Sequence, residues 1–230
     1  VNYGKTGVLI INLGTPDSTS WLDIRKYLKE FLSDRRVIEV NPLIWQVILN
    51  LYILTFRPSK TAKAYKEIWM KDKNMSPLRF FTESQAHKLS EKIGNEKLIV
   101  DFAMRYGNPS IRYGLERLKK SGVKEVLLAP LFPHHAQATT ESSLKFAYKQ
   151  MKEINWNPLT KELGHFPNNP NFINPLVESI RPYLQEDSHL LFSYHGLPIS
   201  HVKRSDKSGK HCQKVENCCG LSLDANSMCY

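Results

Sequence analysis

The sequence predicts an α/β protein built from two doubly wound, Rossmann-like lobes with parallel sheets, the second of them incomplete. Continuous apolar runs of strand length alternate along the chain with longer helical segments, and such runs are typical of strands buried on both faces. A repeat of strand, turn and helix places successive strands parallel in one sheet. The composition agrees, because 41% hydrophobic and 23% charged residues in a chain of 230 are close to globular averages and allow a sizeable core.

Local signals predict the individual elements. The apolar run at residues 7–13, which Gly14-Thr15-Pro16 closes, predicts the first strand. Similar runs predict strands at residues 97–106, 123–132 and 189–194. Capping residues and apolar spacing predict helices at residues 17–31, 42–56, 60–70, 77–93, 109–121, 139–154 and 171–184. The first of these is expected to be capped by Asp17 or Ser18, and Pro58-Ser59 is expected to open the helix at residues 60–70.

The composition shifts toward Asn, Pro and Gly near residues 155–170, which we interpret as the seam between the lobes. The first lobe is then residues 1–155 and the second is residues 156–230. The second would hold only its first helix and strand. Because the chain does not start with Met and stops at Cys229-Tyr230 without a closing helix, we expect it to be part of a longer protein.

The charge balance favours an anionic partner. There are 32 Lys and Arg residues against 22 Asp and Glu residues, a net charge of +10, which suits nucleic acid, a lipid surface, or a carboxylate- or phosphate-bearing ligand. The chain has neither a Rossmann pyrophosphate loop nor a P-loop. Its basic runs, Asp34-Arg35-Arg36, Lys119-Lys120 and Lys203-Arg204, lack interleaved aromatic residues, so we interpret them as solvated faces and expect no nucleic-acid partner.

The longest apolar stretch is residues 43–56, 14 residues that include Gln46 and Asn50. A membrane-spanning helix needs about 20. The stretch is either a buried core helix or a hydrophobic lip that receives a flat apolar ligand or contacts one face of a bilayer. With no signal peptide visible, we expect a cytoplasmic protein, with peripheral contact at the inner face of the membrane as an extension of that prediction.

Candidate chemical groups follow the predicted strands. His195 follows the strand at residues 189–194, Arg105-Tyr106 closes the strand at residues 97–106, and His134-His135 follows the strand at residues 123–132. Ligands of open α/β sheets bind at the carboxyl ends of strands, and an imidazole there can accept a proton or bind a metal. The bland alternatives are a histidine hydrogen-bonded within a turn and a surface pair of histidines.

All four cysteines lie within 18 residues, in the pattern His211-Cys212-x5-Cys218-Cys219-x9-Cys229. Four thiolates in one loop suit tetrahedral zinc or a [2Fe–2S] cluster. Because the adjacent pair Cys218-Cys219 is atypical of a zinc ribbon, both metals stay open at this point, as do disulfides and free thiols.

Several of these segments together resemble the ferrochelatase family. The segments are Ile11-Asn12-Leu13-Gly14-Thr15-Pro16, Phe31-Leu32-Ser33-Asp34-Arg35-Arg36, Ser76-Pro77-Leu78, Met104-Arg105-Tyr106-Gly107, Thr139-Thr140-Glu141-Ser142-Ser143 and Leu191-Phe192-Ser193-Tyr194-His195-Gly196-Leu197-Pro198. They fall in the family's order and cover the chain up to about residue 210. The resemblance implies insertion of Fe(II), a substrate, into protoporphyrin IX to give protohaem.

The resemblance also implies roles for individual residues. His195 matches the metal-site histidine that accepts the pyrrole N–H protons. The positions that match porphyrin-holding residues are Arg57, Tyr65 and Ser76, with Leu13 beneath the macrocycle and Arg105 and Tyr106 on the face opposite the histidine. Arg57 and other basic residues would pair with the propionates.

The chain departs from the family pattern at three places. His134-His135-Ala136 stands where most members have Gln-Tyr-Ser. The family's metal-site glutamate belongs to a later acidic segment that is not in this sequence. The cysteine segment replaces a Gly-Asp-Pro-Tyr-Pro stretch and resembles bacterial members with a [2Fe–2S] cluster, which we therefore prefer to zinc as the ligand of Cys212, Cys218, Cys219 and Cys229.

Three other functions remain open. A non-catalytic tetrapyrrole or metal carrier would use the same pocket without metallation. A membrane-surface scaffold would use residues 43–56 and the basic face. A cobalt or nickel chelatase would share the fold, although the lip and the set Arg57, Tyr65 and Ser76 favour a porphyrin.

Overall fold

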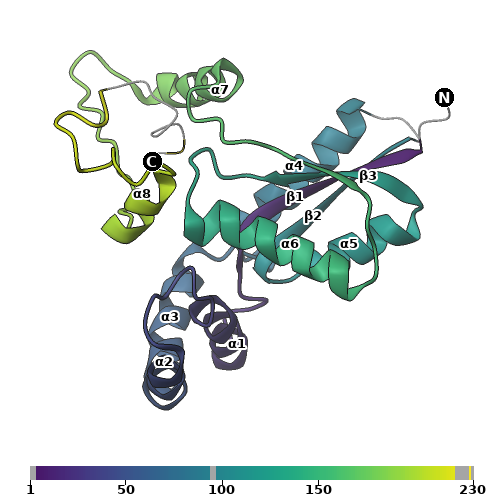
Figure 1. Ribbon diagram of the computed structural model, residues 1–230, viewed down its shortest axis with the longest axis horizontal. Coiled ribbons are helices and arrows are strands. Elements are labelled where there is room, and N and C mark those ends of the chain that lie inside the picture. The colour runs from purple at the N-terminus through teal and green to yellow at the C-terminus, as the bar shows by residue number, and fades with distance from the viewer. Residues whose placement is uncertain (1–3, 94–96, 221–227, 229–230) are drawn as a thin grey trace. The chain divides into compact units, whose positions relative to one another are not determined.

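A computed structural model describes residues 4–93, 97–220 and 228 of the chain. The chain folds into two compact units. The first consists of residues Val1–Leu131 and Gln137–Leu163, and the second of Phe132–Ala136 and Gly164–Tyr230. The elements of both are labelled in Figure 1.

The first unit is built on a four-stranded parallel sheet in the order β2-β1-β3-β4, which confirms the predicted α/β class. The strands are β1 (Lys5–Thr15), β2 (Leu98–Gly107), β3 (Val123–Pro130) and β4 (Leu159–Glu162). The prediction missed β4, which lies in the stretch we interpreted as a seam. Its four residues are mostly exposed, so it has no buried apolar run to reveal it.

Helices cover both faces of this sheet (Figure 1). One face carries α4 (Pro77–Ile93), and the other carries α5 (Ile111–Lys120) and α6 (Ser142–Glu153), which follows a π-helical turn, η2 (Gln137–Glu141). Neighbouring side chains of a strand point to opposite faces. Leu9 and Ile11 of β1 therefore enter the core beneath α5 and α6, while Val8 and Ile10 pack with Ala86 of α4.

A separate helical layer, which we call the lip layer, joins β1 to α4. It comprises α1 (Trp21–Leu32), α2 (Pro42–Ile48), a π-helical turn η1 (Leu49–Ile53) and α3 (Leu54–Ile68). Ser20 caps α1 by accepting a hydrogen bond from the Asp23 N–H, so the expected caps at Asp17 and Ser18 were wrong. The layer has its own core of buried side chains, to which β2 contributes Tyr106.

The predicted break at Pro58-Ser59 was wrong, because Pro58 lies inside α3 and the helical path continues from α2 through η1. A proline has no N–H, so it leaves the carbonyl of the residue four positions earlier without its helical partner. That carbonyl belongs to Leu54, and Arg25 of α1 donates its Nε–H to it at 3.1 Å. The donor that permits the proline therefore comes from a neighbouring helix.

The second unit contains α7 (Pro170–Ile180), a 3-10 turn η3 (Arg181–Tyr183) and α8 (Ile199–Ser205). The strand predicted at residues 189–194 does not form. A strand needs a neighbour for its backbone hydrogen bonds, and the described part of this unit contains no other strand. The apolar side chains that suggested it are exposed, with Leu191 82% and Tyr194 68% accessible.

Replacing Arg25 by Ala is expected to lower the free energy of unfolding by about 1–2 kcal/mol, because the buried Leu54 carbonyl loses its only cross-helix donor within the described residues. Chemical denaturation measures the loss. In a Pro58→Ala background the helix regains an N–H at position 58, so the same replacement should have a smaller effect. Lys26→Ala, an exposed neighbour on α1, is the control, and equal losses in both backgrounds would contradict this account.

Candidate ligand-binding site

A groove follows one face of η1 and α3. Its hollow of about 810 Å³ is lined by Tyr52, Ile53, Phe56, Arg57, Lys60, Thr61, Ala64, Tyr65, Glu67 and Ile68. Helical periodicity explains the set, because Lys60 and Thr61 follow Arg57 by three and four positions. Ala64 and Tyr65 follow Thr61 by the same spacing. The structure thus brings together Arg57 and Tyr65, and it adds Lys60, to which the sequence analysis gave no role. Its position three residues after Arg57 was the available signal.

Aromatic rings give this groove an apolar wall with cations beside it. The rings of Tyr52 and Phe56 lie 5.3 Å apart. Tyr65 makes edge contacts with Tyr27 at 6.2 Å and with Trp69 at 6.5 Å, which fixes its ring. Such a surface can bind a flat apolar ligand through the rings and pair its carboxylates with the basic side chains.

Leu13 lies near the carboxyl end of β1, half-buried against the core of the lip layer. The next residue, Gly14, has φ +113°, and a Cβ there would lie 1.8 Å from the carbonyl oxygen of Tyr106. Only glycine fits this close approach of β1 and β2. The approach sets Leu13 and Tyr106 at the same edge of the sheet, as the sequence predicts for strand ends.

Arg105 and Tyr106 end β2 in a buried cluster. The Arg105 Nη2–H donates to Asp34 Oδ2 at 2.6 Å and its Nε–H donates to Ser142 Oγ at 2.8 Å. The Tyr106 hydroxyl donates to Asp34 Oδ2 at 2.9 Å, and Ser142 also donates to that oxygen. Asp34 is 9% exposed and Arg105 7%, so the interpretation of Asp34 as part of a solvated basic run was wrong.

Two opposing influences set the pKa of Asp34. Burial alone would raise it, but the Ser142 hydroxyl, the Arg36 N–H at 2.8 Å and the Arg105 charge outweigh burial. The pKa of Asp34 therefore lies below its ordinary value of 3.8. Burial raises the pKa of Tyr106, so at neutral pH the cluster holds a carboxylate, a guanidinium and a neutral phenol.

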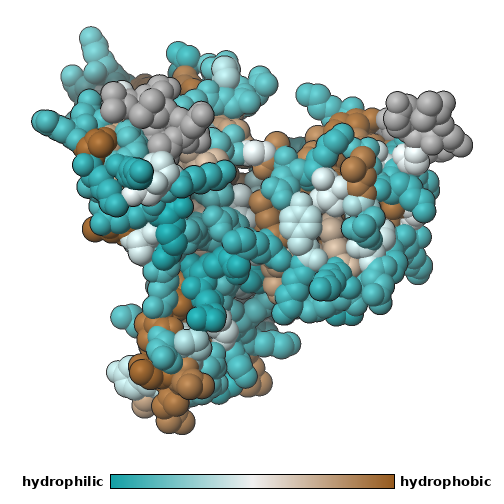
Figure 2. Space-filling model, in the orientation of Figure 1, coloured by the Kyte–Doolittle hydropathy of each residue, from teal (hydrophilic) through white to brown (hydrophobic). Residues whose placement is uncertain are grey.

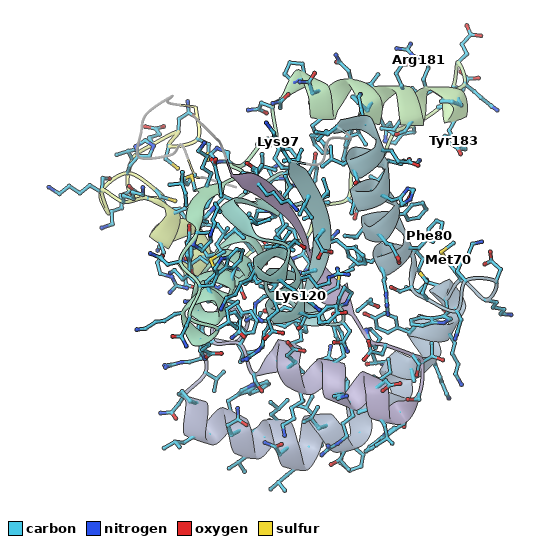
Figure 3. All side chains as sticks on the ribbon, turned by 90° about the vertical axis from the view of Figure 1, so that its right-hand side faces the viewer. Met70, Phe80, Lys97, Lys120, Arg181 and Tyr183 are labelled. Carbon is cyan, nitrogen blue, oxygen red and sulfur yellow. The ribbon has the colours of Figure 1, made fainter. Side chains whose placement is uncertain are left out.

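Ser76 is buried and caps α4 through a hydrogen bond from the Arg79 N–H at 3.3 Å. Met70 and Phe80, labelled in Figure 3, flank this residue in the sequence, after the end of α3 and in the first turn of α4. Met70 pairs with Met75 across the turn between the two helices. Ser76 does not line the groove of Arg57 and Tyr65.

His195 lies in the second unit, in an exposed segment between η3 and α8. Its Nδ1 is 2.7 Å from the carbonyl oxygen of Gly196. A carbonyl only accepts, so this contact places the proton on Nδ1 and leaves the Nε2 lone pair to accept a proton or bind a metal. His134 lies in the same unit, with its ring 6.4 Å from that of Tyr194.

The cysteine segment is also part of the second unit. The sulfur atoms of Cys218 and Cys219 are 3.9 Å apart, and Cys212 is buried. Asp206 organises the turn before them, because its carboxylate accepts the N–H groups of His211 and Cys212, both at 2.9 Å. Cys229 lies outside the described residues. Among the described residues, no three His, Cys, Asp or Glu side chains are grouped closely enough to hold a metal.

Fold and groove together define an open α/β protein with a site suited to a flat, largely apolar ligand that carries acidic groups. A family model described as Ferrochelatase matches residues 5–230. Proteins named Ferrochelatase from Francisella tularensis subsp. tularensis (strain WY96-3418) and subsp. novicida (strain U112) are each 42% identical over 217 residues, 93% of this chain and 65% of the relative.

A further protein named Ferrochelatase, from Allorhizobium ampelinum (strain ATCC BAA-846 / DSM 112012 / S4), is 42% identical over 218 residues, 93% of this chain and 63% of that relative. The chain thus spans 63–65% of the length of these relatives. It belongs to the ferrochelatase family, which confirms the resemblance seen in its motifs.

Protonation of Asp34 should lower the free energy of unfolding of the protein at acidic pH. The pKa of Asp34 is lower in the folded protein than in the unfolded chain. The ionised carboxylate therefore stabilises the fold at a pH above the pKa of the unfolded chain, and this stabilisation is lost as the pH falls through the pKa of the folded protein. The advantage of the natural protein over Asp34→Asn in free energy of unfolding should be constant between about pH 5 and 8 and shrink below about pH 4.

Asp101 provides a control, because its pKa is shifted in the direction opposite to that of Asp34. Burial raises its pKa despite the charge of Arg117, so the natural protein should gain stability relative to Asp101→Asn as the pH falls. Denaturation curves across the pH range measure both differences. Parallel pH profiles for the two variants would contradict the assignment of Asp34.

Proposed function

We propose that the protein inserts Fe(II) into protoporphyrin IX to give protohaem. The observation that carries the proposal is the groove of α3, where aromatic rings lie beside Arg57 and Lys60 in a member of the ferrochelatase family. A macrocycle with two propionates matches that surface in shape and charge.

The chemistry requires a base as well as a binding surface. Metallation removes two pyrrole N–H protons and replaces them with the metal. His195 is our candidate for the base, since its Nδ1 contact with the Gly196 carbonyl leaves Nε2 to accept a proton or to meet the iron. We assign porphyrin contact to Leu13, Tyr65, Ser76, Arg105 and Tyr106 as well, on the family motif.

His195→Ala is expected to abolish metallation while leaving porphyrin binding within about twofold, because the groove is untouched. An anaerobic assay with Fe(II) and protoporphyrin, on the protein expressed from its complete gene, follows the loss of porphyrin fluorescence and the growth of the haem spectrum. His189→Ala removes an exposed imidazole from the same segment and is the matched control.

The outcomes of this assay are separable. Wild-type turnover in His195→Ala would overturn the role of that residue. Porphyrin binding without metallation in the natural protein would overturn the enzymatic proposal in favour of a tetrapyrrole carrier. No binding at all, with lipid binding retained, would favour a membrane-surface scaffold.

We further propose that Cys212, Cys218, Cys219 and Cys229 bind a [2Fe–2S] cluster that fixes their loop. Two thiolates on one tetrahedral metal with bonds of about 2.3 Å lie about 3.8 Å apart, and the 3.9 Å between Cys218 and Cys219 is compatible with that. Cysteine sulfurs are the donors that such a cluster takes, and Cys212, Cys218 and Cys219 bring three of them into the described part of the loop.

Cys212→Ser is expected to remove the visible absorbance of an anaerobically purified sample, because a cluster that loses one of four thiolates is not retained. Iron and sulfide analysis gives a second readout. Ser208→Ala, in the same loop, is the control for loop damage. An unchanged spectrum in Cys212→Ser would contradict the ligand assignment.

We also propose a cytoplasmic protein that contacts the inner face of the membrane through the lip layer. Large apolar side chains are exposed there, among them Leu43 at 81%, Leu51 at 72% and Phe56 at 65%. Figure 2 shows a brown patch at the lower edge of the first unit, over the lip layer. None of the helices in the described ranges is both long and apolar enough to cross a bilayer. The patch therefore suits contact with one leaflet.

A further inference from the structure

The carboxylate of Asp34 joins three elements that are distant in sequence. It follows α1, its partner Arg105 ends β2, and Ser142 begins α6. Its other oxygen accepts the Arg36 N–H, which fixes the carboxylate on the lip-layer side. The partners of this single carboxylate thus come from three parts of the first unit: the segment after α1, the end of β2 and the start of α6.

Two hydrogen bonds and two aromatic rings hold the guanidinium of Arg105. Its Nη2 edge is held by Asp34 and its Nε by Ser142. Its carbon lies 4.4 Å from the ring centre of Tyr106 and 4.2 Å from that of Phe146. Within the described residues, Nη1 is the nitrogen of this group left without a hydrogen bond.

A buried ion pair is a poor source of stability, because desolvation offsets most of its Coulomb attraction. Orientation is what such a pair supplies, since a planar guanidinium held at two nitrogens can present the third in one direction only. Arg105 stands at the carboxyl end of β2, the edge where ligands of open parallel sheets bind.

We propose that Asp34 is a positioning residue for the metallation reaction, which holds the Arg105 guanidinium at fixed orientation and leaves Nη1 as a donor for the substrate at the carboxyl edge of the sheet. The proposal rests on the proposed function and adds a residue to it. The same contact ties the lip layer to the sheet, because Tyr106, whose hydroxyl binds Asp34, packs within the lip-layer core.

The test is a double-mutant cycle on kcat/KM for protoporphyrin, with the variants Asp34→Asn, Arg105→Ala and both together. Asp34→Asn should lower kcat/KM by about 10- to 100-fold, in the range expected when a catalytic group is misplaced by about 1 Å. If Asp34 acts through Arg105, the double variant should be no slower than Arg105→Ala. Arg105→Lys should be as inactive as Arg105→Ala, because a single ammonium group cannot reproduce the hydrogen bonds that Nε and Nη2 make to Ser142 and Asp34.

Asp101→Asn is the matched control. It removes a half-buried carboxylate on β2 that pairs, like Asp34, with an arginine, here Arg117 of α5. It should keep kcat/KM within about twofold. If Asp34→Asn does not fold, Ser142→Ala removes the Nε acceptor while keeping the ion pair, and it should lower kcat/KM in the same direction by a smaller factor.

The results distinguish the positioning role of Asp34 from the proposed metallation activity. A natural protein that binds no porphyrin or makes no haem overturns the proposed function. A natural protein that makes haem, with Asp34→Asn as active as Asp101→Asn or with multiplicative losses in the double variant, overturns the positioning role alone.

Discussion

The buried contact between Asp34 and Arg105 is the constraint on which the first unit depends. It closes the only charged cluster that joins the lip layer, the end of β2 and the start of α6 among the described residues. Removing one partner would leave a charge buried without compensation, which costs far more than the pair contributes. The pair therefore fixes the sheet edge against the helices that carry the groove. Its two residues lie 71 positions apart in the sequence.

The groove itself depends on two further donors that reach across the lip layer. Arg25 supplies the hydrogen bond that Pro58 cannot, and the Trp45 indole donates to the carbonyl of Leu32 at 2.7 Å, near the end of α1. Both donors satisfy backbone carbonyls that helix geometry leaves unpaired. Long helices with exposed apolar faces are poorly held by packing alone, so these contacts explain how α3 can present Arg57, Lys60 and Tyr65 on one rigid face.

The sequence revealed what depends on local pattern. The buried strands β1, β2 and β3 follow from apolar runs. Arg57 and Tyr65 were predicted on either side of a helix break, and the structure places both in α3. The failures concern partners that are remote in sequence. Asp34 resembles a surface residue because Arg105 and Ser142 lie 71 and 108 positions away, and Pro58 resembles a break because its compensating donor is on another helix. The run at residues 189–194 has strand composition but no neighbour to pair with in the described part of its unit.

The central claim is that the cations of α3 recognise the acidic groups of a porphyrin, and titration of the protein with protoporphyrin IX and with its dimethyl ester tests it most directly. The account predicts saturable binding of the diacid, at least about tenfold tighter than binding of the ester. Arg57→Ala and Lys60→Ala should each weaken binding of the diacid and leave the affinity for the ester unchanged. Equal affinity for acid and ester, or diacid binding that survives both replacements together, would contradict it.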